Sequence, residues 1–155
     1  MARASIDAMK FEGIRALAIP LTDILAKNLD LTLLPKESAV LAMPLYPKRE
    51  AERGFNQAHL IAELLAKKIG LRYIPPEHKV LVRARETLQQ AKLSREKRLT
   101  NMRDAFSVQH PNVLAGKTIL LVDDVITTGA TMGEAARALT REGAKTVWAV
   151  AIAQG

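Results

Sequence analysis

The 155-residue chain contains no cysteine. Disulfide bonds and metal sites built from thiolates are therefore excluded. The cellular compartment of the protein has to be inferred from features other than cysteine content. Long apolar runs are missing too. No segment approaches the roughly 18 apolar residues of a membrane span, and residues 1–20 lack the uninterrupted apolar core of a signal peptide. We therefore expect a cytoplasmic protein with no membrane partner.

Acidic side chains are in the minority. The 23 Lys and Arg residues exceed the 16 Asp and Glu residues, which gives a formal charge of +7 and favours anionic partners such as phosphate esters or nucleic acid. Hydrophobic residues make up 48% of the chain, so its length and composition suit one folded core. We predict a single domain over residues 1–155.

Hydrophobic periodicity predicts alternating helices and strands. The predicted helices are residues 13–29, 56–70 and 131–142, with Asn56 as an N-cap and Gly70 as a C-terminal glycine. The predicted strands are residues 38–45, 71–74, 80–82, 118–122 and 146–152, and Trp148 on the last of them is expected in the core. Because the chain closes with strand, helix and strand, a parallel crossover is expected. The predicted fold class is α/β, with a mainly parallel central sheet flanked by helices.

The most informative stretch is LLVDDVITTGAT, residues 120 to 131. A predicted apolar strand ends here in Asp123 and Asp124, and a loop of Thr, Gly and Ala then leads into a helix. Ligands of parallel sheets bind at the carboxyl ends of the strands. Backbone N–H groups and hydroxyls beside a helix N-terminus suit a phosphate, while carboxylates accept hydrogen bonds from vicinal hydroxyls. This order predicts a site for a sugar phosphate such as ribose 5-phosphate.

Two other interpretations compete with a sugar-phosphate site. In the first, an Asp ends the strand, Thr131 caps the helix and Gly129 makes the turn, without any ligand. In the second, the acidic strand is that of a P-loop ATPase, and the chain does contain Gly116-Lys117-Thr118. A P-loop, however, needs a glycine where Pro111 stands and must open a helix, whereas this segment runs into a strand. The ordered combination of acids and loop favours the sugar phosphate.

The stretch LLVDDVITTGAT resembles the phosphoribosyl-pyrophosphate (PRPP) binding motif of type I phosphoribosyltransferases: apolar residues, two acids and, shortly after, Thr-Gly-small-Thr. Within that superfamily the chain is similar to the ComF family, the competence-protein group with GntX-like members. It departs from many members in lacking an N-terminal cysteine-rich zinc module. The further matching residues are Lys10, Gly13, Pro44, Arg49, Arg53, Gly54, Phe55, Asn56, Gln57, Thr87, Gln90, Leu93, Arg98, Asn101, Ala105 and Phe106.

The resemblance implies a type I phosphoribosyltransferase-like fold, with an N-terminal helical region over residues 1–30 and a flexible basic hood loop over residues 83–104. It implies that Asp123 and Asp124 are catalytic carboxylates that bind the ribose hydroxyls. The implied ligand groups are Thr127, Thr128, Gly129, Ala130 and Thr131 for the 5-phosphate; Lys48, Arg49 and Arg53 for pyrophosphate; and Arg83, Arg85, Thr87 and Gln90 in the hood.

Several of these residues also have structural interpretations. Lys48 and Arg49 are also typical of solvated charges on a proline-bounded turn, although their position in the family favours a ligand role. Asn56 is first of all a helix cap. The implied cofactor is magnesium carried by PRPP, with no direct protein ligand other than Asp123 and Asp124. The three histidines share no ligand spacing, so no metal site is assigned to them.

The implied function is binding of PRPP with magnesium and transfer of its phosphoribosyl group to an acceptor that the sequence does not identify. One alternative is a non-catalytic sensor of PRPP or of a nucleotide that controls a partner. Another is a DNA-uptake component that acts with single-stranded DNA or with a helicase-like competence protein. The basic segment from Arg83 to Arg103 suits DNA, but it offers no aromatic stacking platform before Phe106. Since relatives in the superfamily often dimerise, a homodimer is a further expectation.

Overall fold

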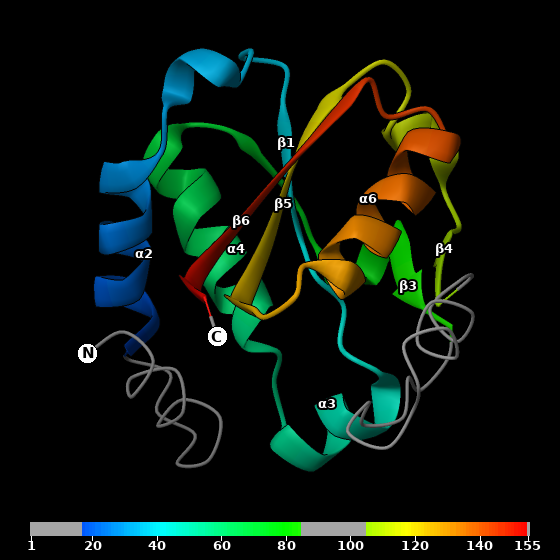
Figure 1. The fold of residues 1–155 in the computed structure, drawn as a ribbon, viewed down its shortest axis with the longest axis horizontal. Coiled ribbons are helices and arrows are strands. Elements are labelled where there is room, and N and C mark those ends of the chain that lie inside the picture. Colours follow the sequence, from blue (N-terminus) through cyan, green and yellow to red (C-terminus); the bar gives the residue numbers. More distant parts are fainter. Residues whose placement is uncertain (1–16, 85–104, 155) are drawn as a thin grey trace.

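The structure is a computed structural model that describes residues 17–84 and 105–154, apart from the side chain of Arg53. Its elements alternate along the chain (Figure 1). The helices are α2 (Ala18–Asn28), α3 (Pro47–Arg53), α4 (Gln57–Ile69) and α6 (Ala130–Arg141), with short 3-10 turns at Leu31–Leu33, Pro76–His78 and Pro111–Val113. The strands are β1 (Ala39–Ala42), β2 (Arg72–Ile74), β3 (Leu81–Arg83), β4 (Phe106–Val108), β5 (Thr118–Ile126) and β6 (Thr146–Gln154).

A parallel sheet of four strands, in the order β2-β1-β5-β6, forms the centre of the described chain. Helices α2 and α4 cover one face and α6 covers the other (Figure 1). Strands β3 and β4 form a separate antiparallel pair. The predicted α/β class, the mainly parallel sheet and the parallel crossover through α6 are therefore confirmed.

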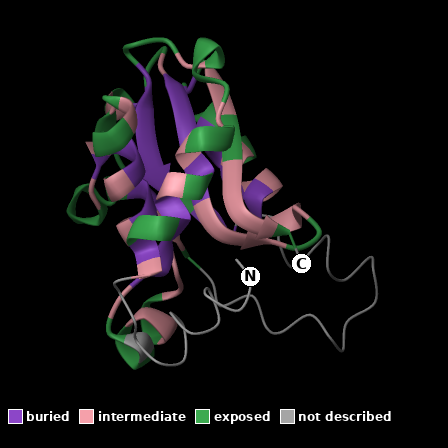
Figure 2. Cartoon of the chain, turned by 90° about the vertical axis from the view of Figure 1, so that its left-hand side faces the viewer, coloured by how far each residue is buried: buried purple, intermediate pink, exposed green. Residues whose placement is uncertain are grey.

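Both faces of the sheet centre are buried, as Figure 2 shows for the inner strands. All four residues of β1 and the first five of β5 are buried, which explains why these strands read as continuous apolar runs rather than as alternating patterns. From α4, the side chains of Ile61 and Leu65 are fully buried in the same core. This core fixes the positions of the ends of β1 and β5, which carry the candidate functional site.

Helix α4 begins and ends as its sequence predicts. The Asn56 side chain accepts a hydrogen bond from the Ala58 N–H at 3.0 Å, and Gly70 ends the helix in the left-handed region with φ 72°. The preceding helix, α3, ends in the same way at Gly54, with φ 73°. The Asn56 side chain also donates a hydrogen bond to the Met43 carbonyl, which places the N-terminus of α4 next to the end of β1.

Strand β5 is longer than the sequence predicts. The prediction ended it at Val122, but the strand continues through both acids to Ile126. The reason is that β6 still pairs with it, from Asp123 opposite Ala151 to Ile126 opposite Gln154, whereas pairing with β1 stops at Val122. Among the described residues, the acids therefore lie on a part of β5 that pairs with a strand on one side only.

Two further predictions are wrong. Lys48 and Arg49 were expected on a proline-bounded turn, but they lie in the helix α3, which Pro47 opens at the first helical position. Trp148 was expected in the core, yet it is 40% exposed because β6 is the edge strand of the sheet that the described residues form.

The structure describes the expected N-terminal helical region and the expected hood loop only in part. The N-terminal region is described from Leu17 onward, and Arg85, Thr87 and Gln90 of the expected hood lie outside the described residues. Within the described ranges no helix has the length and apolar character needed to cross a membrane.

Candidate functional site

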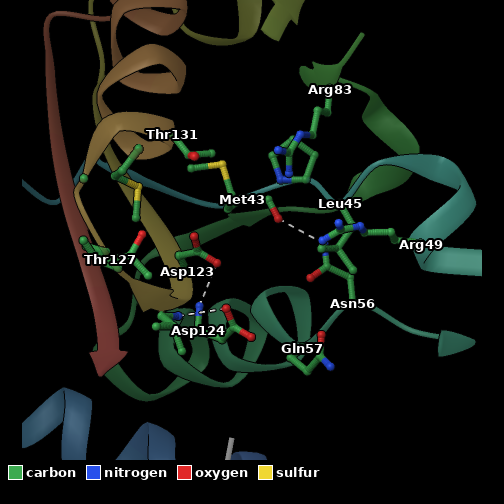
Figure 3. A pocket seen from close by; sticks show the side chains of 15 residues that line it. Met43, Leu45, Arg49, Asn56, Gln57, Arg83, Asp123, Asp124, Thr127 and Thr131 are labelled. Atoms are coloured by element: carbon green, nitrogen blue, oxygen red, sulfur yellow. Dashed lines mark hydrogen bonds between the residues drawn. The ribbon is translucent and has the colours of Figure 1, made fainter. Parts of the chain in front are cut away.

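A cavity of about 200 Å³ lies at the carboxyl ends of β1 and β5, where a parallel sheet is expected to bind ligands (Figure 3). It is formed by the ends of both strands, by α3, by the first residues of α4 and α6, and by β3. The lining residues are Met43, Pro44, Leu45, Arg49, Asn56, Gln57, Arg83, Asp123, Asp124, Val125, Ile126, Thr127, Gly129, Thr131 and Met132.

The two acids stand at the point where β5 leaves β1. The last link between these strands is the hydrogen bond from the Met43 N–H to the Val122 carbonyl, at 2.8 Å. Each carboxylate then accepts the N–H of the residue that follows it: Asp124 donates to Asp123 Oδ1 and Val125 donates to Asp124 Oδ1, both at 2.8 Å. These bonds fix the orientation of the two carboxylates at the wall of the cavity.

The loop after the acids leads into α6 through a left-handed glycine. Gly129 has φ 73° and precedes the first residue of the helix, and its carbonyl accepts the Gly133 N–H at 2.8 Å. Of the five residues predicted for the phosphate loop, Thr127, Gly129 and Thr131 line the cavity, whereas Thr128 and Ala130 do not. The Thr128 hydroxyl instead accepts the Ala130 N–H at 3.4 Å.

The conformation of Gly129 gives a testable contrast with Gly133 of the same helix. Gly129→Ala is expected to destabilise the protein by about 1 kcal/mol, because a side chain at positive φ is strained even though open space surrounds the site. Gly133→Ala is expected to stabilise it by about 0.5–1 kcal/mol, because Gly133 lies inside a helix and an added Cβ meets only the Arg137 side chain at 3.7 Å. Urea denaturation measures both changes, and equal effects of the two substitutions would contradict the backbone assignment.

Two arginines from different elements reach the cavity. Arg49 comes from α3 and Arg83 from β3, and Figure 3 shows them on one side of the cavity, across from the acids and Thr127. The Arg83 guanidinium also lies over the Phe106 ring, 5.7 Å from its centroid, which ties it to the β3–β4 pair. Lys48, predicted beside Arg49, is exposed on α3 and does not line the cavity.

Asn56 belongs to the site as well as to the helix cap. While its oxygen caps α4, its Nδ2 donates a hydrogen bond to the Met43 carbonyl at 3.0 Å, and the side chain is buried. Asn56 thus connects the start of α4 to the end of β1. From the sequence, Asn56 is first predicted to be a helix cap. Only its place in the family-like run Arg53-Gly54-Phe55-Asn56-Gln57 indicates a role in the site.

The apolar walls of the cavity were not predicted. Met43 and Leu45 flank Pro44 at the end of β1, and Met132 lies in the first turn of α6. Apolar side chains in these positions are indistinguishable from core residues in the sequence. Among the described residues, no group of three or more His, Cys, Asp or Glu is arranged to hold a metal ion.

A smaller cavity of about 120 Å³ lies beyond Pro44 and Leu45 and is also lined by His59 of α4. Burial lowers the pKa of His59 to about 4, and the nearby Glu77 carboxylate offsets this only in part. The imidazole is therefore neutral in the folded protein at neutral pH. The second cavity shares Pro44, Leu45 and Arg83 with the first.

The neutral His59 predicts a loss of stability in mild acid. His59 takes up a proton near pH 6.5 in the unfolded chain and only near pH 4 in the folded chain. The contribution of His59 to the free energy of unfolding is therefore complete above pH 6.5 and falls between pH 6.5 and pH 4. At about 1.4 kcal/mol per pKa unit, the fall of the His59 pKa from 6.5 to about 4 corresponds to about 3 kcal/mol of stability. Urea denaturation at pH 7 and pH 5 should show a smaller drop for His59→Gln than for the wild type. His78→Gln, at an exposed position, is the control and should behave like the wild type.

The fold is that of a phosphoribosyltransferase-like protein. Adenine phosphoribosyltransferase from Saccharomyces cerevisiae has the same fold with a TM-score of 0.52, at 14% identity over 92% of this chain and 69% of that chain. The chain belongs to the phosphoribosyl transferase domain family, whose profile matches residues 57–155.

Comparison with curated relatives indicates a particular group within this family. The chain is 37% identical to the DNA utilization protein YhgH of Salmonella typhi over 74% of its length, and 35% identical to competence protein F of Haemophilus influenzae over 73%. It spans about half of these relatives, 48% and 49% of their lengths. The resemblance to the ComF group that the sequence motifs indicate is thereby confirmed.

Proposed function

We propose that this protein binds PRPP with magnesium and transfers its phosphoribosyl group to an acceptor. The observation that carries the proposal is the convergence on one cavity of two adjacent carboxylates, a loop at a helix N-terminus and two arginines from separate elements. A helix cap, a turn or a solvated charge explains each of these features alone. None of them explains why all three meet.

The geometry supports a division of roles within the ligand. Asp123 and Asp124 accept hydrogen bonds from the ribose hydroxyls, and the loop from Thr127 to Thr131 holds the 5-phosphate at the positive end of α6. Arg49 lies across the cavity from them, where a bidentate guanidinium suits pyrophosphate. The proposal also assigns pyrophosphate binding to Lys48 and Arg53. It assigns the hood over the ligand to Arg83, Arg85, Thr87 and Gln90.

Magnesium fits the residues that are present. It prefers oxygen ligands and keeps several waters, so the two carboxylates, together with ligand oxygens, are a sufficient donor set without a third acid. When bound, the ion neutralises charge on the departing pyrophosphate. The residues of the chain hold the ribose between its 5-phosphate and its pyrophosphate, so that the bond from C1 to pyrophosphate breaks with its electron pair on the leaving group as the acceptor bonds to C1.

Pyrophosphate release distinguishes an enzyme from a sensor. The folded protein is incubated with PRPP, magnesium and in turn each member of a panel of nucleobases and amines, and free pyrophosphate is measured. The proposal predicts release that depends on one acceptor class and on Arg49. Binding of PRPP without release by any acceptor would leave the sensor as the better account.

A role connected with DNA is the second candidate, and the names of the relatives favour it. These proteins are called DNA utilization and competence proteins, although the chain matches only about half of their length. Single-stranded DNA and a helicase-like protein are the partners proposed for such a role. A salt titration against labelled single-stranded DNA tests it, because a true contact with phosphates weakens steeply as salt rises.

A further inference from the structure

The wall of the candidate cavity contains a buried amide that lacks a hydrogen bond. Gln57 is the first residue of α4 and is only 1% exposed, yet its Nε2 bonds to no described residue. Its neighbour Asn56, by contrast, uses both ends of its amide, one to cap α4 and the other to bond to the Met43 carbonyl. Gln57 therefore brings a buried donor without an acceptor to the cavity.

A buried donor of this kind destabilises a folded protein. An N–H group that leaves water without finding an acceptor loses its bonds to water and gains none. The great majority of buried polar side chains are paired for this reason, so each exception calls for an explanation. Packing alone does not explain Gln57, because an apolar side chain of the same size would fill the space without this cost. A ligand that brings an acceptor into the cavity would pair the amide.

Gln57 lies where a ligand of the cavity can reach it. It lines the cavity together with Asp123 and Asp124, and α4 packs on both of the strands whose ends form the cavity. Figure 3 shows Gln57 and Asp124 in the lower part of the view, with Arg49 and Arg83 higher. The last torsion of a glutamine side chain is broad and roughly two-fold. The amide can therefore turn its NH2 group toward the cavity while the rest of the side chain stays in place.

The chemistry of the two acids indicates which ligand atom this donor suits. An ionised carboxylate only accepts hydrogen bonds, whereas a hydroxyl donates one bond and also accepts. When Asp123 and Asp124 accept bonds from the ribose hydroxyls, the oxygens of those hydroxyls still have lone pairs that need a donor. An uncharged amide suits an uncharged hydroxyl oxygen, while the arginines suit the charged groups of the ligand.

We propose that Gln57 is a further ligand-binding residue, whose side-chain amide donates a hydrogen bond to a ribose hydroxyl of PRPP. This inference rests on the proposed function and adds a residue to it. The acids accept bonds from the sugar and Gln57 donates one to it, so the two kinds of group complement each other. A site that pairs a hydroxyl in this way rejects ligands that lack it. Gln57 thus contributes to selectivity for the ribose.

Gln57→Met separates this role from packing, because methionine has nearly the same size and helix propensity but no donor. Loss of the unpaired amide is expected to raise the midpoint of thermal unfolding by about 2–4 °C. The same substitution is expected to weaken PRPP binding in the presence of magnesium about 5–10-fold, through the loss of one hydrogen bond. Ribose 5-phosphate should lose affinity by the same factor. Calorimetry measures PRPP directly and ribose 5-phosphate by displacement.

Ser38→Ala is the matched control. Ser38 is also 1% exposed, and its Oγ likewise bonds to no described residue, but it precedes β1 and does not line the cavity. Removal of this hydroxyl should raise the unfolding midpoint as well, for the same reason. The affinity for both ligands should stay within about twofold of the wild type, because one hydrogen bond outside the site contributes nothing to binding.

Three results for Gln57→Met would overturn the proposal. A lower unfolding midpoint would show that the amide stabilises the fold. Unchanged affinity for both ligands, in a protein whose wild type binds PRPP, would show that the amide does not contact them. A loss confined to PRPP would place the amide at the pyrophosphate instead of the ribose. A wild type that binds neither ligand would contradict the proposed function itself, and this inference with it.

Discussion

Replacing both Asp123 and Asp124 by asparagine is expected to weaken PRPP binding at least 100-fold. Hydrogen bonds to charged groups contribute about 1.5–3 kcal/mol each, so the loss of two carboxylates removes about 3–6 kcal/mol of binding energy. The expected change in folding stability is small, because both side chains are only partly buried and asparagine still accepts the bonds from the Asp124 and Val125 N–H groups. Calorimetry in the presence of magnesium measures the affinity, and thermal unfolding measures the stability.

The matched control is Glu134→Gln. Glu134 lies on α6, where its carboxylate pairs with Arg137 at 2.6 Å, and it does not line the cavity. The Glu134→Gln substitution removes one negative charge outside the cavity. PRPP binding should therefore stay within about twofold of the wild type, because surface ion pairs contribute little. If the double asparagine variant bound PRPP as tightly as this control, the assignment of the acidic pair to the ribose would be wrong.

Replacing Asn56 by alanine is expected to destabilise the protein by about 2–4 kcal/mol. The substitution removes the cap of α4, which costs about 1 kcal/mol, and leaves the Met43 carbonyl without its bond, which costs about 1–3 kcal/mol. Asn56→Ser keeps the capping oxygen and loses only the bond to Met43, so it should cost about half as much. Urea denaturation measures all of these variants.

Asn28→Ala provides the comparison for this effect. The Asn28 side chain also donates to a backbone carbonyl, that of Ile24 at 2.8 Å, but this bond is exposed at the end of α2. Its removal should cost less than 0.5 kcal/mol, since water replaces the lost bond. Equal costs for Asn56→Ala and Asn28→Ala would show that the link between β1 and α4 contributes nothing.

The order of helices and strands was predictable because each element carries a local signal. The periodicity of α4, the N-cap at Asn56 and the glycine at Gly70 depend only on neighbouring residues, and all three are confirmed. The end of β5 was not predictable in this way. It depends on how far β6 extends beside it, and strand partners are not encoded within either strand.

The same reason explains the error at Trp148. An apolar run with a tryptophan is typical of a buried strand, but burial depends on the position of the strand in the sheet, and β6 is at the edge. Helix α3 was missed for the opposite reason. Five of its seven residues are charged, and only Pro47 at its start and Gly54 at its end signal a helix.

The candidate site was predictable in its acids and loop, where chemistry and spacing coincide. Asp123, Asp124, Thr127, Gly129 and Thr131 line one cavity together with Arg49 and Arg83. The roles that the family resemblance implies for them stay a prediction. The apolar walls and the second bond of Asn56 required three-dimensional information, because Met43 and Met132 are far apart in the chain and neither is unusual in its own element.

Titration of the wild-type protein with PRPP in the presence of magnesium tests the central claim most directly. The account predicts saturable binding at one site per chain, with a Kd between about 1 µM and 1 mM, and weaker binding of ribose 5-phosphate, which lacks the pyrophosphate that Arg49 is assigned to hold. If the folded protein showed no binding of PRPP at millimolar concentration, the cavity at the ends of β1 and β5 would not be a PRPP site.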